Sequence, residues 1–247
     1  LKLAMAKSKA PAIQVIEKQL KQKKILPVYY LFGEDTYSVE SIVDAIEKAV
    51  QPFITSDFDK ETVYAENQSF ASIIGLASTF PFGSEKKLII VKQAEKLKEK
   101  KEKTEKKEIV NYFQSPTDFT VLVFIHDGTI TNPASDPYKT LASEGYLFEA
   151  KELKGKSLID WLISTVEKKG KTISYENAQM LTDISGENRN TLESQLEKIF
   201  IYVGDSNEIT IDSIRGLSTS LKQYTIFDLQ NAIGKKNKSS ALKVVFN

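Results

Sequence analysis

Short apolar runs alternate with segments of helical periodicity over roughly the first 150 residues, and this alternation constrains the fold more than any other feature. The runs are rich in β-branched and aromatic residues, as strands are. Because apolar residues occupy successive positions, the runs are typical of strands buried on both faces of a parallel sheet. We therefore predict an α/β domain over residues 1–150. The predicted strands are Pro27–Phe32, Glu61–Ala65, Leu88–Val91, Asp118–His126 and Tyr146–Phe148.

An aromatic connection, Phe80-Pro81-Phe82-Gly83, joins a helix predicted at Phe70–Ala77 to the strand at Leu88–Val91. Pro81 fixes its own φ and extends the residue before it, and Gly83 permits a sharp reversal. Two large rings on such a stiff connection either tuck back into the core or protrude as an apolar wedge for a partner. These residues alone leave both alternatives open.

The turn after the first predicted strand has the position of a phosphate-binding loop but lacks the residues of one. Such a loop needs glycines whose amides wrap around phosphates, followed by a lysine and a hydroxyl residue. Here the turn reads Gly33-Glu34-Asp35, and Asp35 or Thr36 would serve as N-cap of the next helix. The two carboxylates would repel a triphosphate. We therefore predict a degenerate loop in which Gly33, Glu34 and Asp35 bind no nucleotide, and a protein without a cofactor.

The composition excludes most catalytic chemistry. The chain has no cysteine and a single histidine, His126, which leaves little material for acid–base catalysis or a zinc site. His126 is either a polar residue that contacts a ligand or, more commonly, a hydrogen-bonded residue at a strand end. We interpret Asp57, Asp59 and Glu61 as a solvated run and not as a metal cluster. We therefore expect neither a catalytic site nor a metal site.

Charge and hydropathy indicate the class of partner and the compartment. A net charge of +1 provides no global basic field, so any contact with nucleic acid must be local. The absence of cysteine suits the cytoplasm, and no apolar run approaches the roughly 18–20 residues that span a membrane. We expect a cytoplasmic protein without a membrane partner.

A lysine-rich segment, Lys96–Lys107, carries seven lysines and three glutamates. Such a segment usually forms a solvated helix face or loop. Its local surplus of positive charge would also suit contact with phosphates. The candidate nucleic-acid contacts are Lys98, Lys100, Lys101 and Lys103.

The composition changes near Lys154, and nearly every later segment has helical periodicity. Leu158, Trp161 and Leu162 share a helical face and are predicted core residues. This pattern predicts a small all-helical domain over 151–218. Residues 219–247 begin another helical domain that is too short for its own core, so we expect the chain to be cut short. The helices predicted before it are Ser157–Lys169, Tyr175–Ile184, Arg189–Val203 and Thr210–Leu217.

Three stretches together resemble the family of delta subunits of the bacterial DNA polymerase III clamp loader. The first, Pro27–Asp35, is similar to the opening strand and degenerate turn of that family. The second, Phe80–Val91, is similar to its hydrophobic pair, charged turn and apolar strand. The third begins with Gly186–Ile199 and continues through Ile209-Thr210 to Ile226–Ile233. Each stretch alone is weakly specific, but their order covers nearly the whole chain.

The resemblance implies an AAA+-like parallel-sheet domain with a degenerate P-loop, a small helical lid domain and the start of a helical collar domain. It also implies that a hydrophobic pair at the tip of the first domain enters an apolar pocket on the sliding clamp. By this match the clamp-binding residues are Pro81 and Phe82, with Phe80 beside them. The family often has Leu-Phe at this pair, so the main anchor among the three stays open.

The implied role is to bind and open the ring-shaped sliding clamp, the beta subunit, for loading onto primed DNA. The implied partners are the clamp, the gamma or tau and delta prime subunits contacted through the collar, and primed DNA within the assembled complex. Other loader subunits would hydrolyse ATP, so this chain would be a non-catalytic subunit of the DNA polymerase III holoenzyme. With most of the collar absent, we expect clamp binding but poor assembly.

Two functions of other classes remain as alternatives. One is a nucleotide-dependent phosphotransferase on the same scaffold, which would need the lysine and hydroxyl that the first turn lacks. The other is a nucleic-acid-binding module that uses Lys96–Lys107. Salt-dependent DNA binding by this chain alone would support the second alternative.

Overall fold

The computed structural model describes residues 10–98, 103–218 and 234. The chain divides into two compact units, with the division between Glu152 and Leu153, and each unit has its own apolar core. The predicted collar segment, 219–247, lies outside the described residues apart from Gly234. None of the helices in the described ranges is long and apolar enough to cross a membrane.

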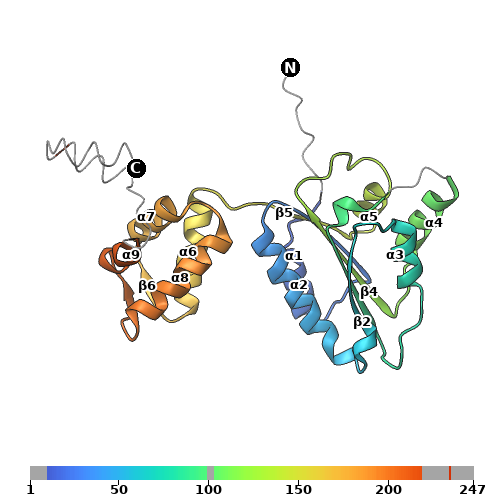
Figure 1. Ribbon diagram of the computed structural model, residues 1–247, viewed down its shortest axis with the longest axis horizontal. Coiled ribbons are helices and arrows are strands. Elements are labelled where there is room, and N and C mark those ends of the chain that lie inside the picture. The colour runs from blue at the N-terminus through green and yellow to red at the C-terminus, as the bar shows by residue number, and fades with distance from the viewer. Residues whose placement is uncertain (1–9, 99–102, 219–233, 235–247) are drawn as a thin grey trace, which may run out of the picture. The chain divides into compact units, whose positions relative to one another are not determined.

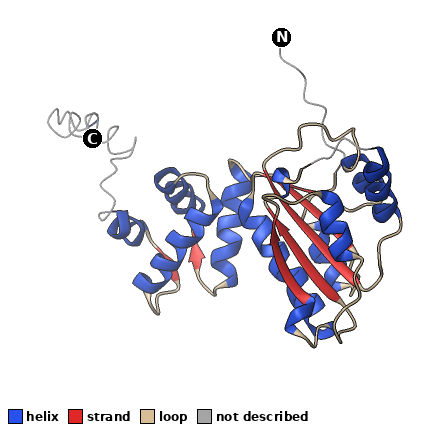
Figure 2. Cartoon of the chain, turned by 45° about the vertical axis from the view of Figure 1, so that its right-hand side comes forward, coloured by secondary structure: helices blue, strands red, loops and turns tan. Residues whose placement is uncertain are grey.

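A parallel sheet forms the centre of the first unit, and its five described strands lie in the order β2-β3-β4-β1-β5 (Figures 1 and 2). The inner strands β1, β3 and β4 are buried along most of their length, as their unbroken apolar runs predict. The α/β prediction is therefore confirmed. The strands are β1 Val28–Gly33, β2 Lys60–Tyr64, β3 Lys87–Lys92, β4 Thr120–Asp127 and β5 Leu147–Ala150.

Helices cover both faces of this sheet (Figure 1). α1 and α2 pack on the face that carries Tyr29 and Ile90, and α3, α4 and α5 pack on the face that carries Tyr30 and Phe124. Right-handed crossovers explain this division, because the chain crosses the sheet one way from β1 to β2 and then returns towards β5. The helices are α1 Val15–Lys21, α2 Thr36–Val50, α3 Phe70–Ala77, α4 Lys103–Gln114 and α5 Tyr138–Ser143, with short 3₁₀ turns η1 Gln51–Phe53, η2 Asp57–Asp59 and η3 Ala94–Lys96.

The first helix begins later than the sequence indicates. Pro11, followed by Ile13, Ile16 and Leu20 at helical spacing, predicts a helix from Pro11, but α1 begins at Val15. Before it, Ala12 forms a β-bridge with Glu149 of β5, and the Ile13 amide donates to the Glu149 carbonyl at 3.0 Å. The chain thus first lines the outer edge of β5 and covers an edge strand that would otherwise be open.

The described part of the second unit contains four helices and a small sheet. The helices surround a core that includes Leu158 and Leu162, and Trp161 is half-buried against this core. The all-helical prediction is wrong in one respect, because β6 and β7 pair in parallel and the Thr172 amide donates to the Asn207 carbonyl at 2.7 Å. Strands of two residues are too short to produce an alternating pattern. The elements are α6 Lys156–Lys168, β6 Thr172–Ile173, α7 Tyr175–Ser185, α8 Arg189–Val203, β7 Glu208–Ile209 and α9 Ile211–Ser218.

Candidate functional site

The connection Phe80-Pro81-Phe82-Gly83 lies at the edge of the sheet where the strands begin. α3 ends at Ala77, and the chain turns back through residues 80–84, which we call the tip loop, before it enters β3. Phe80 is 81% exposed and Phe82 is 74% exposed, whereas Pro81 is half-buried. The two rings therefore protrude, which is the wedge alternative of the two that the sequence leaves open.

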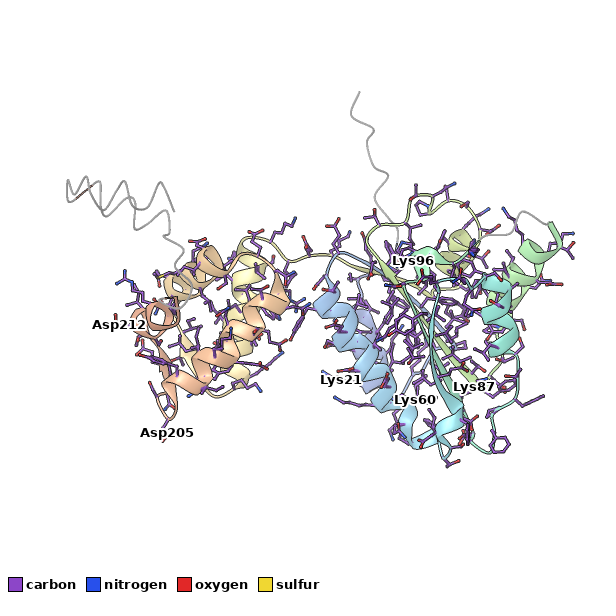
Figure 3. The ribbon with its side chains drawn as sticks, viewed as in Figure 1. Lys21, Lys60, Lys87, Lys96, Asp205 and Asp212 are labelled. Atoms are coloured by element: carbon purple, nitrogen blue, oxygen red, sulfur yellow. The ribbon has the colours of Figure 1, made fainter. Side chains whose placement is uncertain are left out.

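Two further aromatic rings lie beside the tip loop, because the strands of a parallel sheet begin at the same edge. Phe58 precedes β2 and meets Phe82 edge to face, with ring centres 5.9 Å apart. Phe119 precedes β4 and stacks on Phe80, with ring centres 4.7 Å apart. We call these four residues the aromatic edge, and Figure 3 labels Lys87, the first residue of β3, at this end of the sheet. Phe58 is 80% exposed, so three of the four rings are largely open to solvent.

A buried carboxylate, Asp59, holds the tip loop. Asp59 is the last residue of η2 and is only 1% exposed. It accepts hydrogen bonds from the amides of Phe82 and Ser84, the second at 3.2 Å. Because these amides already have a fixed acceptor, the backbone beneath the Phe82 ring would lose little further freedom on docking.

Ser84 makes a second connection between the tip loop and the residues that precede β2. Its hydroxyl oxygen accepts hydrogen bonds from the amides of Thr55 at 2.9 Å and Ser56 at 3.1 Å, and its hydroxyl donates to Asp59. Residues 55–59, which we call the brace segment, are therefore bonded to the tip loop in both directions. The two segments form one rigid surface beneath the exposed rings.

Lys87 fixes the chain on the other side of the tip loop. It is 6% exposed, and its ammonium donates to the Thr79 hydroxyl at 2.9 Å and to the Leu76 carbonyl at 3.3 Å. Leu76 belongs to the last turn of α3, where a positive charge is favourable. The tip loop is thus held on both sides while its two phenyl rings stay exposed.

The groups around Asp59 favour its ionised form. Burial alone would raise the pKa of the Asp59 carboxyl. Hydrogen bonds from Phe82 and Ser84, together with the nearby Lys87 ammonium, outweigh burial and lower this pKa below its ordinary value. Asp59 therefore carries a negative charge at neutral pH.

The acidic run at Asp57–Glu61 is not the solvated run that the sequence indicates. Asp57 is exposed, but Asp59 is buried against the tip loop. The sequence reasoning missed both Asp59 and Phe58 because a short acidic run resembles an ordinary surface turn. Their position in the sequence could have indicated this role, because both residues come just before the strand predicted at Glu61–Ala65. Strands of a parallel sheet begin at the same edge, so these residues should lie near the start of the Leu88–Val91 strand. Within the described ranges, no group of three or more acidic or histidine side chains could hold a metal ion.

The turn after β1, at the opposite edge of the sheet, is closed by internal contacts. The buried Asp35 carboxylate accepts hydrogen bonds from the Ser38 amide at 3.2 Å and the Ser38 hydroxyl at 2.7 Å, and so caps α2. Phosphates bind at this position of a helix in other α/β proteins. Gly33 has φ of +138°, and a Cβ there would lie 2.1 Å from the Ala150 carbonyl oxygen. Glu34 is exposed beside them.

A hollow of about 450 Å³ beside this turn is acidic. It lies along α2 and the ends of β2 and β3, and four carboxylates but only one ammonium line it. This local excess of negative charge would repel a polyphosphate. The charged lining residues are Glu40, Asp44, Glu47, Lys92 and Asp127.

His126 is a hydrogen-bonded residue at the end of β4. It is 6% exposed, and its Nδ1 lies 2.8 Å from the Tyr30 hydroxyl. Burial lowers the pKa of His126, against the raising effect of the nearby Glu95 carboxylate. These contacts favour the structural alternative over a role in ligand binding.

The structure describes part of the lysine-rich segment. Figure 3 labels Lys96 at the end of the sheet opposite the aromatic edge. The Lys98 ammonium donates to an asparagine side chain at 3.2 Å, and Lys103 begins α4. Lys100 and Lys101 lie outside the described residues. Contact between these lysines and nucleic acid therefore stays a prediction.

Comparisons with known proteins find one family repeatedly. A family model described as DNA polymerase III, delta subunit matches residues 29–151. The DNA polymerase III subunit delta of Bacillus subtilis (strain 168) is 30% identical over 234 residues, which are 93% of this chain and 67% of the relative. A probable DNA polymerase III subunit delta of Aquifex aeolicus (strain VF5) is 21% identical over 222 residues, which are 88% of this chain and 62% of that protein.

The fold comparison points to the same group. The solved structure of the Bacillus subtilis DNA clamp loader delta protein superimposes with a TM-score of 0.65 at 27% sequence identity. The match covers 95% of this chain and 70% of the solved chain. Sequence and fold similarity thus extend over both compact units.

Proposed function

This chain belongs to the family of DNA polymerase III delta subunits, and we propose that it binds the ring-shaped sliding clamp through Phe80, Pro81 and Phe82. In this proposal it holds the clamp in an opened form, so that the loader can place the clamp on primed DNA. The likeness to a solved clamp loader delta protein supports the assignment to clamp loading.

One observation carries the proposal, namely two exposed rings on a loop that is fixed on both sides. Transfer of a Phe side chain from water to an apolar pocket contributes about 1.5–3 kcal/mol. Asp59 and Lys87 already order the loop, so docking costs little additional entropy. Aromatic anchors near the centre of an interface usually carry most of its energy. Phe80 and Phe82 therefore suit the role of anchors.

Opening the clamp requires more than tight binding. A subunit shifts the equilibrium between closed and opened rings only if it binds the opened ring more tightly. Moving the ratio from 1:99 to 99:1 needs a preference of about 10⁴-fold. In the proposal, the rigid tip loop supplies this preference, because a fixed wedge matches only one arrangement of its pocket.

The proposal assigns no ATP hydrolysis to this chain. The Gly33–Asp35 turn is short, the Asp35 carboxylate caps α2 where a phosphate would sit, and the hollow beside the turn is acidic. Other loader subunits would hydrolyse ATP. A collar domain would connect this chain to the gamma or tau and delta prime subunits.

The test is the affinity of this chain for the sliding clamp of the same organism, measured by calorimetry. We expect the Phe80→Ala/Phe82→Ala variant to lose about 2 kcal/mol or more of binding free energy, roughly 30-fold in Kd. Its stability should change little, because both side chains are exposed.

Ile201→Ala/Tyr202→Ala provides a matched control. These side chains are 83% and 61% exposed and belong to the second unit, so the variant removes comparable exposed apolar surface elsewhere. The control should bind the clamp like the parent chain. Equal binding by the parent and the tip-loop variant would place the contact elsewhere, and no binding by the parent would overturn the proposal.

Contact with primed DNA is a second part of the proposal and concerns the lysine-rich segment. Each phosphate that a lysine neutralises contributes about −0.9 to the slope of log affinity against log salt. Replacing Lys98, Lys100, Lys101 and Lys103 by Gln in the assembled loader should therefore flatten the slope by up to about four. An unchanged slope would remove these lysines from the DNA contact.

A further inference from the structure

We infer that Phe58 is a third clamp anchor, presented by the brace segment beside the tip loop. The inference rests on the proposed function and enlarges its docking surface from one loop to two. Neither the hydrophobic pair of the tip loop nor the lysine-rich segment includes Phe58. The relevant juxtaposition is the ring contact between Phe58 and Phe82.

Phe58 is exposed in a way that packing within the chain does not explain. It is 80% exposed, although Asp59, the next residue, is almost completely buried. Single exposed apolar side chains are common on soluble proteins. Here Phe58 and Phe82 touch edge to face at 5.9 Å, and Phe80 lies on the same tip loop. Exposed rings from two segments thus lie at one edge of the sheet, and two of them are in direct contact, which is typical of a protein interface.

The brace segment also holds Phe58 in a fixed position. The Phe58 amide donates to the Ser56 hydroxyl at 3.3 Å, which begins the η2 turn. The next residue, Asp59, binds the amides of Phe82 and Ser84. The Phe58 backbone therefore cannot move away from the tip loop unless these bonds break. Such preorganisation is what an anchor residue requires.

The geometry of the Phe58–Phe82 pair also indicates the shape of the pocket that would accept it. An edge-to-face pair presents the side of one ring and the face of the other, so the complementary pocket must be apolar and wide enough for two rings. Asp57 is exposed next to Phe58 and would lie at the polar rim of the contact. The clamp pocket of the proposed function should therefore extend towards the brace segment.

The experiment compares Phe58→Ala, Phe82→Ala, Tyr64→Ala and the parent chain for binding to the purified sliding clamp. Tyr64 is 59% exposed on β2 but lies outside the aromatic edge, so it serves as a control. We expect Kd to rise at least tenfold for Phe58→Ala and less than twofold for Tyr64→Ala. Phe58→Leu should recover most of the affinity, because the pocket responds to apolar area. The unfolding transitions of all variants should match that of the parent.

The outcomes separate this inference from the proposed function. If Phe82→Ala weakens binding and Phe58→Ala does not, Phe58 lies outside the interface and the proposed function stands. If Phe58→Ala weakens binding only as much as Tyr64→Ala does, the anchor role is also overturned. If the parent chain does not bind the clamp, both proposals are wrong.

Discussion

The two edges of the sheet in the first unit have opposite characters. At the edge where the strands end, Asp35 caps α2 and Gly33 packs against Ala150, so the turn is filled by the chain itself. At the edge where the strands begin, Phe58 and Phe82 are exposed above a hydrogen-bonded base. Open α/β sheets usually bind their ligands at the first of these edges. In the described part of the first unit, the three most exposed aromatic rings, Phe58, Phe80 and Phe82, are at the second.

Under the proposed function, this α/β scaffold binds its partner at the edge opposite to the usual one. We call the edge where the strands end the closed edge. Its polar groups form hydrogen bonds with one another, which stabilise the fold and leave few groups to bind a ligand. At the open edge, the edge with the tip loop, the charged side chains of Asp59 and Lys87 form hydrogen bonds that order the chain around that loop. Its rings contribute little to the fold, because they remain in water. Their transfer out of water is favourable, and it takes place only when a partner covers them.

The largest expected effect on the free energy of unfolding comes from a substitution at the closed edge. Gly33→Ala would place a Cβ 2.1 Å from the Ala150 carbonyl oxygen at φ of +138°. Overpacking and backbone strain each cost about 1–3 kcal/mol, so unfolding in urea should show a loss of about 3 kcal/mol or more. Gly83→Ala in the tip loop is the control, since its Cβ would meet nothing within 4 Å and only the strain at φ of +91° applies. Equal losses would contradict the difference between the edges.

Next in size is the effect of Asp59 at the open edge. Asp59→Asn keeps the shape of the side chain but removes its charge and replaces one of the two oxygens that accept hydrogen bonds from the Phe82 and Ser84 amides. Hydrogen bonds to charged groups contribute about 1.5–3 kcal/mol, so we expect a loss of about 2 kcal/mol at pH 7. Asp57→Asn, a neighbouring exposed position, should change stability by less than about 0.5 kcal/mol.

The effect of Asp59 should also depend on pH. Because the folded state lowers the pKa of Asp59, its contribution is fully present above the ordinary aspartate pKa of about 4. Below that value the unfolded chain takes up the proton first, so the contribution falls and disappears as pH passes through the lower folded-state pKa. Urea unfolding of the parent and Asp59→Asn from pH 7 to pH 3 should therefore show converging stabilities. A constant difference would contradict this assignment.

A smaller effect is expected from the helix cap. Asp35→Ala removes the acceptor of the Ser38 amide and hydroxyl at the start of α2. Loss of an N-cap typically costs about 1 kcal/mol, measurable by urea unfolding. Asp35→Asn should retain most of this stability, because asparagine caps helices about as well. If both variants were as stable as the parent, the carboxylate would have no structural role at the closed edge.

The sequence predicts the closed edge better than the open one. The cap at Asp35 and the parallel strands follow from local patterns, because capping and burial on both faces act over a few residues. The sequence predicts the start of α1 too early, since the bridge between Ala12 and Glu149 joins residues far apart in the chain. Phe58 and Asp59 were missed for the same reason.

The tip loop illustrates this limit most clearly. Pro81 and Gly83 predict a stiff reversal, but they do not decide whether the adjacent rings point inward or outward. That outcome depends on Asp59, which belongs to the connection before β2 and lies beside the loop because β2 and β3 are neighbours in the sheet. A local pattern contains no information on such a partner, so the sequence left both alternatives open.

The smallest expected effect is that of a nucleotide on the closed edge. A ligand at 100 times its Kd stabilises a protein by about 2.7 kcal/mol, so ATP at 1 mM would clearly raise Tm if Kd were about 10 μM. We expect a change in Tm of less than about 1 °C with Mg²⁺ and ATP.

The Glu34→Lys/Asp35→Ser variant separates the effect of charge from that of loop length, because it removes both carboxylates and introduces an ammonium and a hydroxyl. A three-residue turn is shorter than the eight-residue phosphate-binding motif and cannot wrap a triphosphate, so this variant should not bind either. Binding by the variant alone would show that charge, and not the short turn against Ala150, closes this edge.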